Sequence, residues 1–564
     1  MGVLDPTLPP YDPLEWEKKP FPERAELVCR SWAMQGYGSP AAIYVVYLLK
    51  IVVLYVGGWL LWCSFTPGLG QLGTIGQWWL EPVAFQKAIV WSMAFEIIGL
   101  GCGSGPLTGR YLPPIGGFLH FLRPGTTKLP PWPALPLLGG HRRTALDALL
   151  YAALLGALGW TLSSPTPGVE QFAAIVGLLV VLGLADKTLF LAARAEHYWT
   201  TMICFVLAGP WIAGAKAVQL ALWFWAGVSK LNHHFPAVVA VMNSNSPFTR
   251  FAWFRRLLYR NFPNPNPKAK AKAKHDAAPL DLRPSRTATI MGHFGTALEF
   301  AVPLILAFAP EGPWLITGLV LMLILHGYIS SNVPMGVPLE WNVMVVYGGF
   351  ALFWAHPEVS VLELGQAPLL AAILAVMLIG LPLLGNLVPS AVSFLLAMRY
   401  YAGNWAGSVW LLRGDSHRKL EQLKKSAGWV DDQLGRFYER PTIVALLSKV
   451  MAFRLMHLHG RLLPMLLPQA VEQIDDYQWV DGEIIAGLAL GWNFGDGHLH
   501  DERLLAAIQE QCGFAPGELR CVFFESQPLG RSTMAWRIAD AASGPIAAGE
   551  VKISELRARQ PWGS

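Results

Sequence analysis

The chain carries little charge for its size. Asp, Glu, Lys and Arg make up only 14% of its 564 residues, whereas 53% are hydrophobic and 24 are tryptophan. Charge this sparse, combined with repeated apolar stretches of about 20 residues, excludes an ordinary soluble protein. The composition instead predicts a helical membrane protein that crosses the bilayer several times.

Cysteine is also scarce, and no cleavable signal is evident. The six cysteines form no CxxC pair and show no spacing typical of metal ligands, so we interpret them as packing residues. The N-terminal sequence Met1-Gly-Val-Leu-Asp-Pro has neither a basic region nor an apolar region of the signal-peptide kind. The first membrane helix is therefore expected to direct the chain to the membrane.

Two motifs imitate ligand sites without the context that such sites need. The glycine-rich stretch 99–105 follows an apolar segment, without a preceding strand or a following Lys-Ser/Thr, which favours a helix exit over a phosphate loop. The segment Gly497-His-Leu-His-Asp-Glu502 resembles a metal-binding cluster. Its two imidazoles would lie on the same side only if the segment were a strand, and Asp501-Glu502 are better explained as the start of a helix. His457-Leu-His459 adds two more imidazoles in the same spacing. No metal site is predicted.

The positive charge is concentrated in one segment. Residues 250–286 hold ten lysines and arginines against two aspartates, although the net charge of the whole chain is only +5. Its Pro/Asn run and alternating Lys-Ala stretch predict a flexible loop on the cytoplasmic side, in contact with anionic lipid headgroups. No nucleic-acid-binding fold surrounds these residues, so nucleic acid is not an expected partner.

Nine apolar segments predict the membrane topology: 42–65, 85–101, 145–163, 171–192, 198–231, 294–309, 313–331, 341–355 and 366–386. The fifth would be about 51 Å long as one helix, well beyond a hydrocarbon core of about 30 Å. Gly209-Pro210 and Gly214 offer a break, which raises the prediction to about ten crossings. Ten crossings put the basic loop and both termini on the cytoplasmic side of the inner (plasma) membrane.

The predicted fold is an all-α polytopic membrane bundle with a small C-terminal α+β soluble domain. Strand-like runs at 519–525, 533–538 and 546–553, and a helix at 501–512, support the second part. The expected divisions are an N-terminal interfacial segment at 1–40, a transmembrane domain at 41–387, an interfacial linker helix at 388–413 and a cytoplasmic domain at 414–564.

Ionisable groups inside or at the end of apolar segments are costly to bury and are candidates for function. They are Glu96, Asp186, Lys187, Glu196, His197, Lys216, Lys230, His293, Glu299, His326 and Glu340. Asp186 and Lys187 are neighbours that would point about 100° apart on a helix, so each is expected to have a separate structural partner. The spacing allows His326, Asn332 and Glu340 to converge at one membrane depth.

Lys230 ends an aromatic-rich run, residues 221–234, where a membrane helix meets its boundary. A lysine there can extend its stem so that the ammonium reaches the interface. A desolvated ammonium can instead lose its proton near neutral pH and serve as a base. The sequence leaves both interpretations open.

Four elements in order resemble the membrane core of vitamin K-dependent gamma-glutamyl carboxylase and related horizontally transferred transmembrane proteins. They are Asp186-Lys-Thr188 followed by His197-Tyr198, Trp225-Ala-Gly-Val-Ser-Lys230-Leu, His293-Phe-Gly-Thr-Ala-Leu-Glu299, and His326-Gly-Tyr-Ile-Ser-Ser-Asn332. The resemblance covers about residues 145–355. The whole chain also resembles an uncharacterised family of actinobacterial transmembrane proteins.

The resemblance implies a membrane enzyme with a quinone of the menaquinone type as cofactor. Lys230 would be the base, and His197 and His326 would line the quinone or oxyanion site. Glu196, Asn232, His293, Glu299, Asn332 and Glu340 would contact the substrate. Glu196 stands where the family has asparagine, and the large luminal domain that holds the carboxylase's peptide substrate is not apparent. A lipid or quinone substrate is therefore expected rather than a protein glutamate.

Two other classes use the same residues differently. A lipid or small-molecule transporter would use the intramembrane polar groups as a binding path. A non-catalytic scaffold would use them as structural pairs and would bind a partner enzyme through its C-terminal domain.

Overall fold

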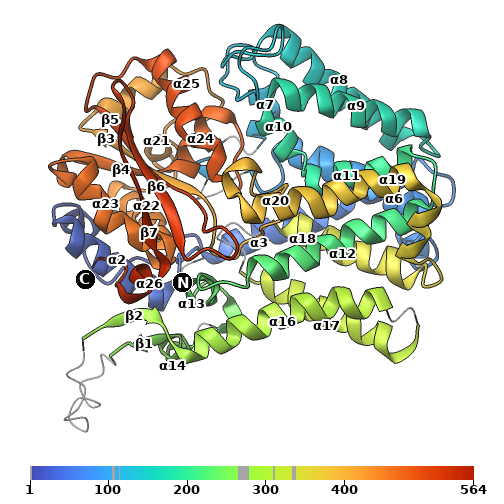
Figure 1. Cartoon of the computed structure of the whole chain (residues 1–564), viewed down its shortest axis with the longest axis horizontal. Helices are drawn as coiled ribbons and strands as arrows, with labels where there is room; N and C mark the ends of the chain where they lie inside the picture. The colour runs from blue at the N-terminus through green and yellow to red at the C-terminus, as the bar shows by residue number, and fades with distance from the viewer. Residues whose placement is uncertain are drawn as a thin grey trace.

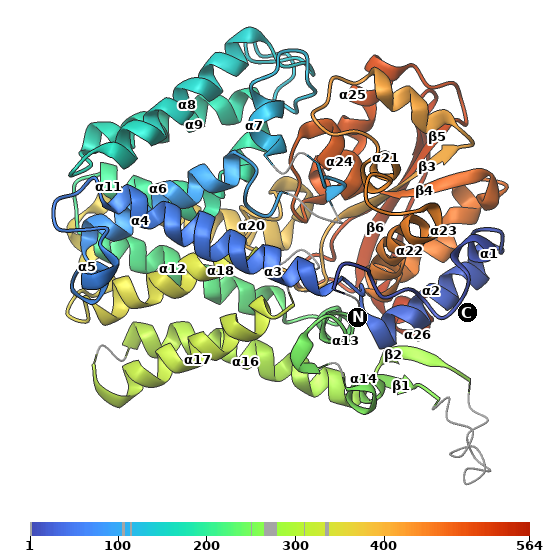
Figure 2. The same ribbon diagram turned by 180° about the vertical axis from the view of Figure 1, so that it is seen from behind.

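The computed structural model describes residues 3–103, 108–112, 115–249, 251–263, 279–308, 311–332 and 338–563. It places a bundle of helices beside a C-terminal part that contains the main sheet (Figure 1). From behind, α8 (Ala145–Ser163) and α9 (Val169–Ala185) form one edge of the bundle (Figure 2). The α16 (Arg286–Phe308) and α17 (Gly312–Ser330) hairpin forms the opposite edge.

Five helices in the described part of the chain are long and apolar enough to span a membrane: Ala41–Cys63, Ala145–Ser163, Arg286–Phe308, Gly312–Ser330 and Pro368–Leu387. The first consists of α3 (Ala41–Leu49), η1 (Lys50–Val56) and α4 (Gly57–Cys63), and the last of α19 (Pro368–Ala375), η8 (Val376–Gly380) and α20 (Leu381–Leu387). The chain is therefore a membrane protein, with five such helices against the ten predicted crossings.

The other predicted segments form helices that are either shorter or less apolar than these five. They are α6 (Pro82–Ile97), α9, α10 (Lys187–Ala192), η4 (Ala195–Trp199), α11 (Thr200–Val206), α12 (Trp211–Ser229), and α18 (Leu339–Gly348) with η6 (Gly349–Trp354). The predicted break in 198–231 is confirmed, because α11 ends at Val206 and α12 begins at Trp211, behind Pro210. Proline lacks the amide hydrogen that a continuous helix would need there.

The C-terminal part is built on a five-stranded antiparallel sheet of order β4-β3-β5-β6-β7. The strands are β3 (Gly407–Arg413), β4 (Tyr477–Asp481), β5 (Leu519–Phe524), β6 (Thr533–Asp540) and β7 (Gly544–Lys552). The three predicted strand runs are confirmed as β5, β6 and β7. The predicted helix is α25 (Glu502–Cys512), whose N-cap Asp501 accepts a hydrogen bond from the Arg503 amide.

Helices complete this part: α21 (Val430–Leu434), α22 (Arg440–Met456), η11 (His459–Leu462), α23 (Leu463–Ala470), α24 (Gly482–Leu490) and α26 (Ile553–Ala558). Arg440–Met456 and His459–Ala470 together are apolar enough for a sixth span but are bent by 93°. Because α23 contacts β5 and α22 contacts the N-terminal helix α2, we assign the bent pair to the C-terminal domain.

The prediction of a linker helix at 388–413 is wrong. Only η9 (Pro389–Ala391) is helical there, Met398 has a φ of 50°, and β3 occupies 407–413. Hydrogen bonds fix the chain in this form: Asn404 donates to the Gln527 carbonyl at 2.8 Å and accepts from the Gln527 amide at 2.7 Å. Strand β3 of the main sheet thus begins before residue 414, the predicted start of the soluble domain.

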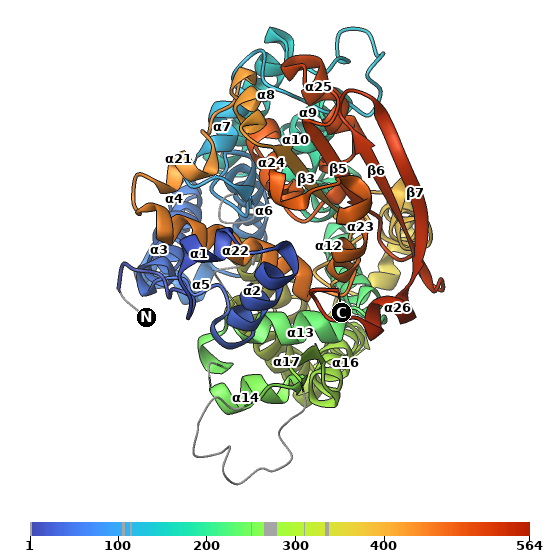
Figure 3. The same ribbon diagram turned by 90° about the vertical axis from the view of Figure 1, so that its left-hand side faces the viewer.

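The N-terminal segment packs on the C-terminal domain, although it was expected on the membrane face. It forms α1 (Pro13–Glu17) and α2 (Phe21–Gln35), and α2 lies beside α22 (Figure 3). Trp32 is fully buried and donates to the Val241 carbonyl at 3.1 Å. Arg24 pairs with Asp475 at 2.5 Å.

The remaining elements are short: η2 (Leu72–Thr74), α5 (Ile75–Trp78), α7 (Gly116–Phe121), α13 (Phe235–Asn243), η5 (Pro247–Thr249), α14 (Ala252–Leu257), η7 (Val361–Gln366), η10 (Ser416–Gln422), η12 (Ile474–Asp476) and η13 (Gly497–Leu499). In the predicted basic loop, β1 (Tyr259–Asn261) pairs with β2 (Asp281–Pro284). Its Lys-Ala stretch lies outside the described residues, which omit 264–278.

Candidate functional site

A cavity of about 250 Å³, here called the central cavity, lies where the helical bundle meets the C-terminal domain. Helices α12, α13, α16, α17 and α18 contribute to its lining, together with the 394–405 segment and Phe453 and Phe494 of the C-terminal part. Most lining residues are apolar or aromatic, among them Trp223, Trp341 and Trp405. A pocket that is mostly apolar with a few polar groups is typical of a small-molecule site.

An ion pair faces this cavity. Lys230, the C-cap residue of α12, places its Nζ 2.6 Å from Oε1 and 2.6 Å from Oε2 of Glu299 on α16. The two side chains are 9% and 5% exposed, and the Phe235 ring lies 5.4 Å from the ammonium. Such a pair is costly to desolvate and is held by its mutual attraction, so removing either partner leaves an unbalanced charge.

His326 on α17 also lines the cavity, but both of its ring nitrogens are engaged. Nε2 is 2.9 Å from the Trp223 indole nitrogen, which can only donate, so Nε2 accepts and is unprotonated. Nδ1 is 2.8 Å from Oδ1 of Asn342 and therefore donates. These contacts assign the neutral Nδ1–H tautomer and orient the ring.

Asn332 is the fourth predicted site residue in the lining of the cavity. Its amide nitrogen donates to the Tyr328 carbonyl at 3.0 Å, and its buried Oδ1 has no partner among the described residues. The structure thus brings together Lys230, Glu299, His326 and Asn332.

His197 and Glu196 lie on η4, outside the set of residues that line the central cavity. His197 is buried beside Tyr198 and Trp341, with ring centroids 4.7 and 6.1 Å apart, and it is not among the lining residues. Glu196 accepts from Arg194 Nε at 2.8 Å. Trp341 reaches both the cavity and His197, so it separates the two predicted histidines.

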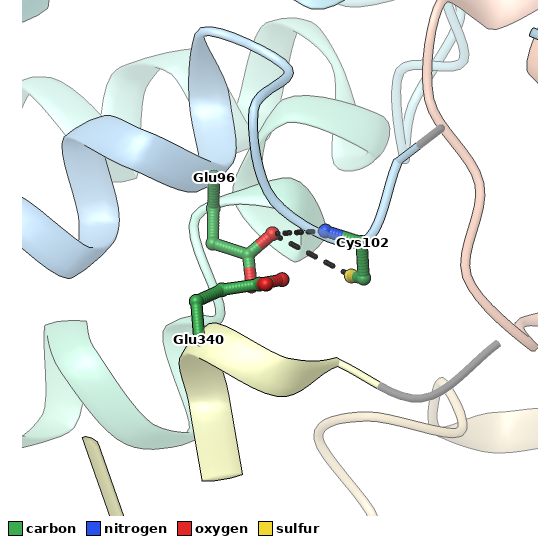
Figure 4. Close-up of side chains that lie close together, drawn as sticks. All are labelled: Glu96, Cys102 and Glu340. Carbon is green, nitrogen blue, oxygen red and sulfur yellow. Dashed lines mark hydrogen bonds between the residues drawn. The ribbon is translucent and has the colours of Figure 1, made fainter. Parts of the chain in front are cut away.

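Glu340 belongs to a buried acidic cluster beside the cavity, formed with Glu96 and Cys102 (Figure 4). Oε2 of Glu96 accepts from the Cys102 amide at 3.1 Å and contacts the thiol at 3.5 Å. One potential ligand atom from each residue lies within 4.8 Å of the others, a set that could hold a divalent cation. Nζ of Lys50 lies 3.2 Å from Oε2 of Glu340, so the lysine already supplies a positive charge to this acidic cluster.

Arg194 links this cluster to the cavity. It has a left-handed φ of 51°, is fully buried and lies 5.1 Å from the Trp341 ring and 5.5 Å from Phe494. Its Nη1 and Nη2 atoms have no hydrogen-bond partner among the described residues. The Arg194 guanidinium therefore lies buried in the wall of the cavity, where Glu196 is its ion-pair partner.

Asn232 and His293 lie outside the central cavity. Asn232 caps the turn after α12, where its Oδ1 accepts from the His234 amide at 2.7 Å. His293 is exposed on α16. Both line a second pocket on the other side of the α12–α16 contact.

The histidines of the 497–502 motif have partners within the protein. His500 Nδ1 contacts Ser408 Oγ at 2.7 Å, and His498 Nε2 lies 2.9 Å from Glu525. Burial alone would lower the pKa of His498, but hydrogen bonds with Asp496 and Glu525 outweigh it and raise the pKa to about 10. His498 is thus a positively charged structural group at neutral pH.

The sequence did not predict Lys50, Cys102 or Arg194 as residues of the site. Glu96 was predicted only as an ionisable group in an apolar segment. Arg194 lies between two apolar segments, where an arginine is usually taken for an interfacial anchor. Asp186 was expected to have a structural partner, and it accepts from Arg143 at 2.6 Å.

A model of the family described as "Transmembrane protein of unknown function (DUF3556)" matches residues 1–564. The chain therefore belongs to this transmembrane family. No curated protein and no solved structure matches the chain.

Proposed function

We propose that this protein is a membrane enzyme that binds a lipid- or quinone-like molecule in the central cavity and transfers a proton at Lys230. The observation that carries the proposal is the Lys230–Glu299 pair, with Nζ 2.6 Å from both carboxylate oxygens at the wall of an apolar cavity. Buried charged groups that face an apolar pocket are typical of sites that bind and act on small molecules.

The pair can generate a base without an external proton acceptor. One proton moves from Nζ of Lys230 to an Oε atom of Glu299, which leaves a neutral amine and a carboxylic acid. A ligand that fills the cavity and excludes water favours this neutral form, because the charged form is the one that desolvation penalises. The amine then takes a proton from an acidic C–H or O–H of the substrate, which becomes an anion beside the regenerated ammonium.

The lining suits the ring of a quinone. Trp223, Trp341, Tyr400 and Trp405 line the cavity with aromatic rings, and Arg194 lies in its wall. Flat rings favour stacked or edge contacts with such faces. A bound quinol would supply reducing equivalents, while Lys230, Glu299 and Arg194 would hold protons and charge.

The likeness to the carboxylase core rests on the motifs that carry Lys230, Glu299 and His326. These three residues line one cavity although 69 positions separate the first two. His197 would support the site indirectly, through the ring of Trp341 that it contacts.

Untargeted lipid and quinone profiling tests the proposal. A strain that lacks the gene is complemented with the native protein or with the Lys230→Met variant, and membrane amounts are matched. We expect the deletion and Lys230→Met to lose the same product and accumulate the same precursor. A Lys230→Met profile identical to that of the native protein would overturn the assignment.

Arg503→Met provides a matched control. Arg503 is half exposed and pairs with Asp501 in the C-terminal domain, outside the lining of the cavity. The control variant should restore the native profile. A transporter would instead change the distribution of an unmodified molecule between compartments, and a scaffold would tolerate Lys230→Met but not deletion of 414–564.

We also propose that the protein lies in the plasma membrane with both termini cytoplasmic. The N-terminal segment contacts the C-terminal domain through Arg24–Asp475 at 2.5 Å and Arg440–Glu17 at 2.8 Å. Segments in contact lie on one side of a membrane, so an even number of crossings would separate them. The prediction of ten meets this condition, whereas the five long apolar helices would need at least one further crossing. Fluorescent-protein and alkaline-phosphatase fusions at each terminus test this: both ends should be fluorescent and phosphatase-negative, and opposite results at the two ends would contradict it.

A further inference from the structure

The second pocket, here called the arginine pocket, has a volume of about 730 Å³ and a strongly positive wall. Six arginines from separate parts of the chain line it: Arg260, Arg283, Arg399, Arg461, Arg531 and Arg557. His233 and His293 add two imidazoles, and no Asp or Glu is among the lining residues that the structure describes. Of the six, only Arg283 is paired with an acid among the described residues, Asp281 at 2.5 Å. The remaining like charges around one space repel one another unless an anion lies between them.

Two of these arginines are buried without an acidic partner. Arg461 is 1% exposed and donates only from Nη1, to the Arg559 carbonyl at 3.0 Å, while its Nε and Nη2 have no partner among the described residues. Arg399 is 3% exposed and donates from Nη2 to the Asn404 carbonyl at 2.8 Å. Neither forms an ion pair within the described ranges.

Nearby acids do not balance these charges. Asp281 is engaged by Arg283 at 2.5 Å, and Glu525 is engaged by His498 at 2.9 Å. Burial lowers the pKa of Arg399 to about 10, which still leaves the guanidinium charged at neutral pH. Buried charge without compensation is strongly destabilising, so a site that keeps it is suited to a ligand of opposite charge.

The shape of the donors indicates the kind of anion. Guanidinium groups present paired N–H donors in a planar fork that matches two oxygens of one phosphate. We propose that the arginine pocket binds a phosphate or pyrophosphate group, carried by an anionic lipid or by a small soluble molecule. The proposal is independent of the central cavity.

The position of the pocket is consistent with both sources. Thr289 and His293 line it from the first turns of α16, next to Ile290 and Phe294, which are 69% and 65% exposed. An apolar outer surface beside a cationic pocket near a helix end is the arrangement expected at the headgroup level of a membrane. On the other side, the pocket reaches the C-terminal domain at Arg531 and Arg557.

Titration of the purified full-length protein in an uncharged maltoside detergent tests the proposal. One arm adds inorganic pyrophosphate and the other adds short-chain phosphatidylglycerol, with binding measured by calorimetry and by the shift in Tm. We expect saturable binding in at least one arm, weakened by salt. Binding of the lipid alone assigns a headgroup, and binding of pyrophosphate assigns a soluble phosphate source.

Arg461→Met removes the charge and keeps an apolar stem of comparable length. We expect affinity to fall at least tenfold while the Tm of the ligand-free protein stays equal or rises, because an uncompensated charge has gone. Arg503→Met, outside the pocket, should bind as the native protein does. No binding in either arm, or native affinity in Arg461→Met, would overturn the proposal.

A second variant tests the proposal if the Arg461→Met protein does not fold. Arg531 and Arg557 are exposed at the rim, so the double variant Arg531→Gln/Arg557→Gln is expected to fold. It should weaken binding and reduce its dependence on salt. Unchanged affinity and salt dependence in this double variant would also contradict an anion site.

Discussion

The central cavity and the arginine pocket are both lined by residues at the C-terminal end of α12. They differ in whether the buried charges in their walls have partners of opposite charge. Lys230 faces the cavity and is balanced by Glu299, whereas Ser229 and Asn232 face the arginine pocket, where Arg399 and Arg461 have no acid within pairing distance among the described residues. A balanced pair can exchange a proton internally. An unbalanced cluster needs a counter-charge from outside the chain.

The difference separates the two functions that we propose. The proposed proton transfer at the cavity would depend on the geometry of two side chains, at the end of α12 and on α16. The proposed anion binding at the pocket would depend on charges from six separated positions. Substitutions that alter one region should therefore leave the other nearly unchanged, because sites without shared partners act additively.

The largest effect is expected from breaking the cavity pair. Glu299→Gln leaves the Lys230 ammonium buried without its counter-charge and should lower the free energy of unfolding by about 3–5 kcal/mol. Thermal unfolding in detergent measures the loss. The double variant Lys230→Met/Glu299→Leu removes both charges and should recover most of the stability. An equal loss in both variants would show that the loss does not come from the unpaired ammonium.

The same substitution should have opposite effects on compensated and uncompensated arginines. Arg454 is 1% exposed and is bound by Asp481 and Glu483, so Arg454→Met should cost about 3 kcal/mol. Arg399→Met, in the arginine pocket, should cost little or raise stability in the absence of ligand. Chemical denaturation measures the free energy of unfolding of the two variants. Equal losses would contradict the distinction between arginines with and without an acidic partner.

A smaller effect is expected from pH. The pKa of His498 is raised from 6.5 to about 10, so its stabilising contribution is complete below pH 6.5 and is lost as pH rises toward 10. His498→Gln should cost about 2 kcal/mol at neutral pH and flatten this alkaline loss. Tm profiles between pH 6 and 10 measure it, and parallel profiles for the two proteins would exclude His498 as the titrating group.

The smallest effect is expected at His326. Trp223→Phe removes the indole donor to Nε2 and should cost about 1 kcal/mol, while freeing an imidazole nitrogen toward the cavity. Thermal unfolding checks the stability, and the lipid and quinone profile checks whether the freed nitrogen alters turnover. A loss near that of Glu299→Gln would mean that the ring orientation, rather than the ion pair, holds the cavity together.

Local patterns in the sequence predicted several parts of the structure. Gly209-Pro210 and Gly214 indicated a break, which lies between α11 and α12, and strand-like runs predicted β5, β6 and β7. Costly intramembrane charges pointed to Lys230, Glu299 and His326, which do line one cavity. Each of these features depends on the conformational preference of a few neighbouring residues, or on the cost of burying a single charged side chain.

The rest depends on contacts between distant segments. Arg194 lines the cavity through a left-handed turn that no local pattern announces. Residues 388–413 are apolar enough to suggest a helix, but they form turns followed by β3. Hydrogen bonds between Asn404 and Gln527, which are far apart in the chain, hold this segment in place. The arginine pocket draws on positions from 260 to 557, so only the folded chain reveals it.

Proton transfer from Lys230 to Glu299 on ligand binding can be measured at the carboxyl group. Infrared difference spectra of the purified protein, recorded before and after addition of a menaquinone-type quinone, report the protonation of carboxyl groups. We expect a protonated-carboxyl band to appear on addition and to be absent in Glu299→Gln. No new band in the native protein, or the same band in Glu299→Gln, would contradict it.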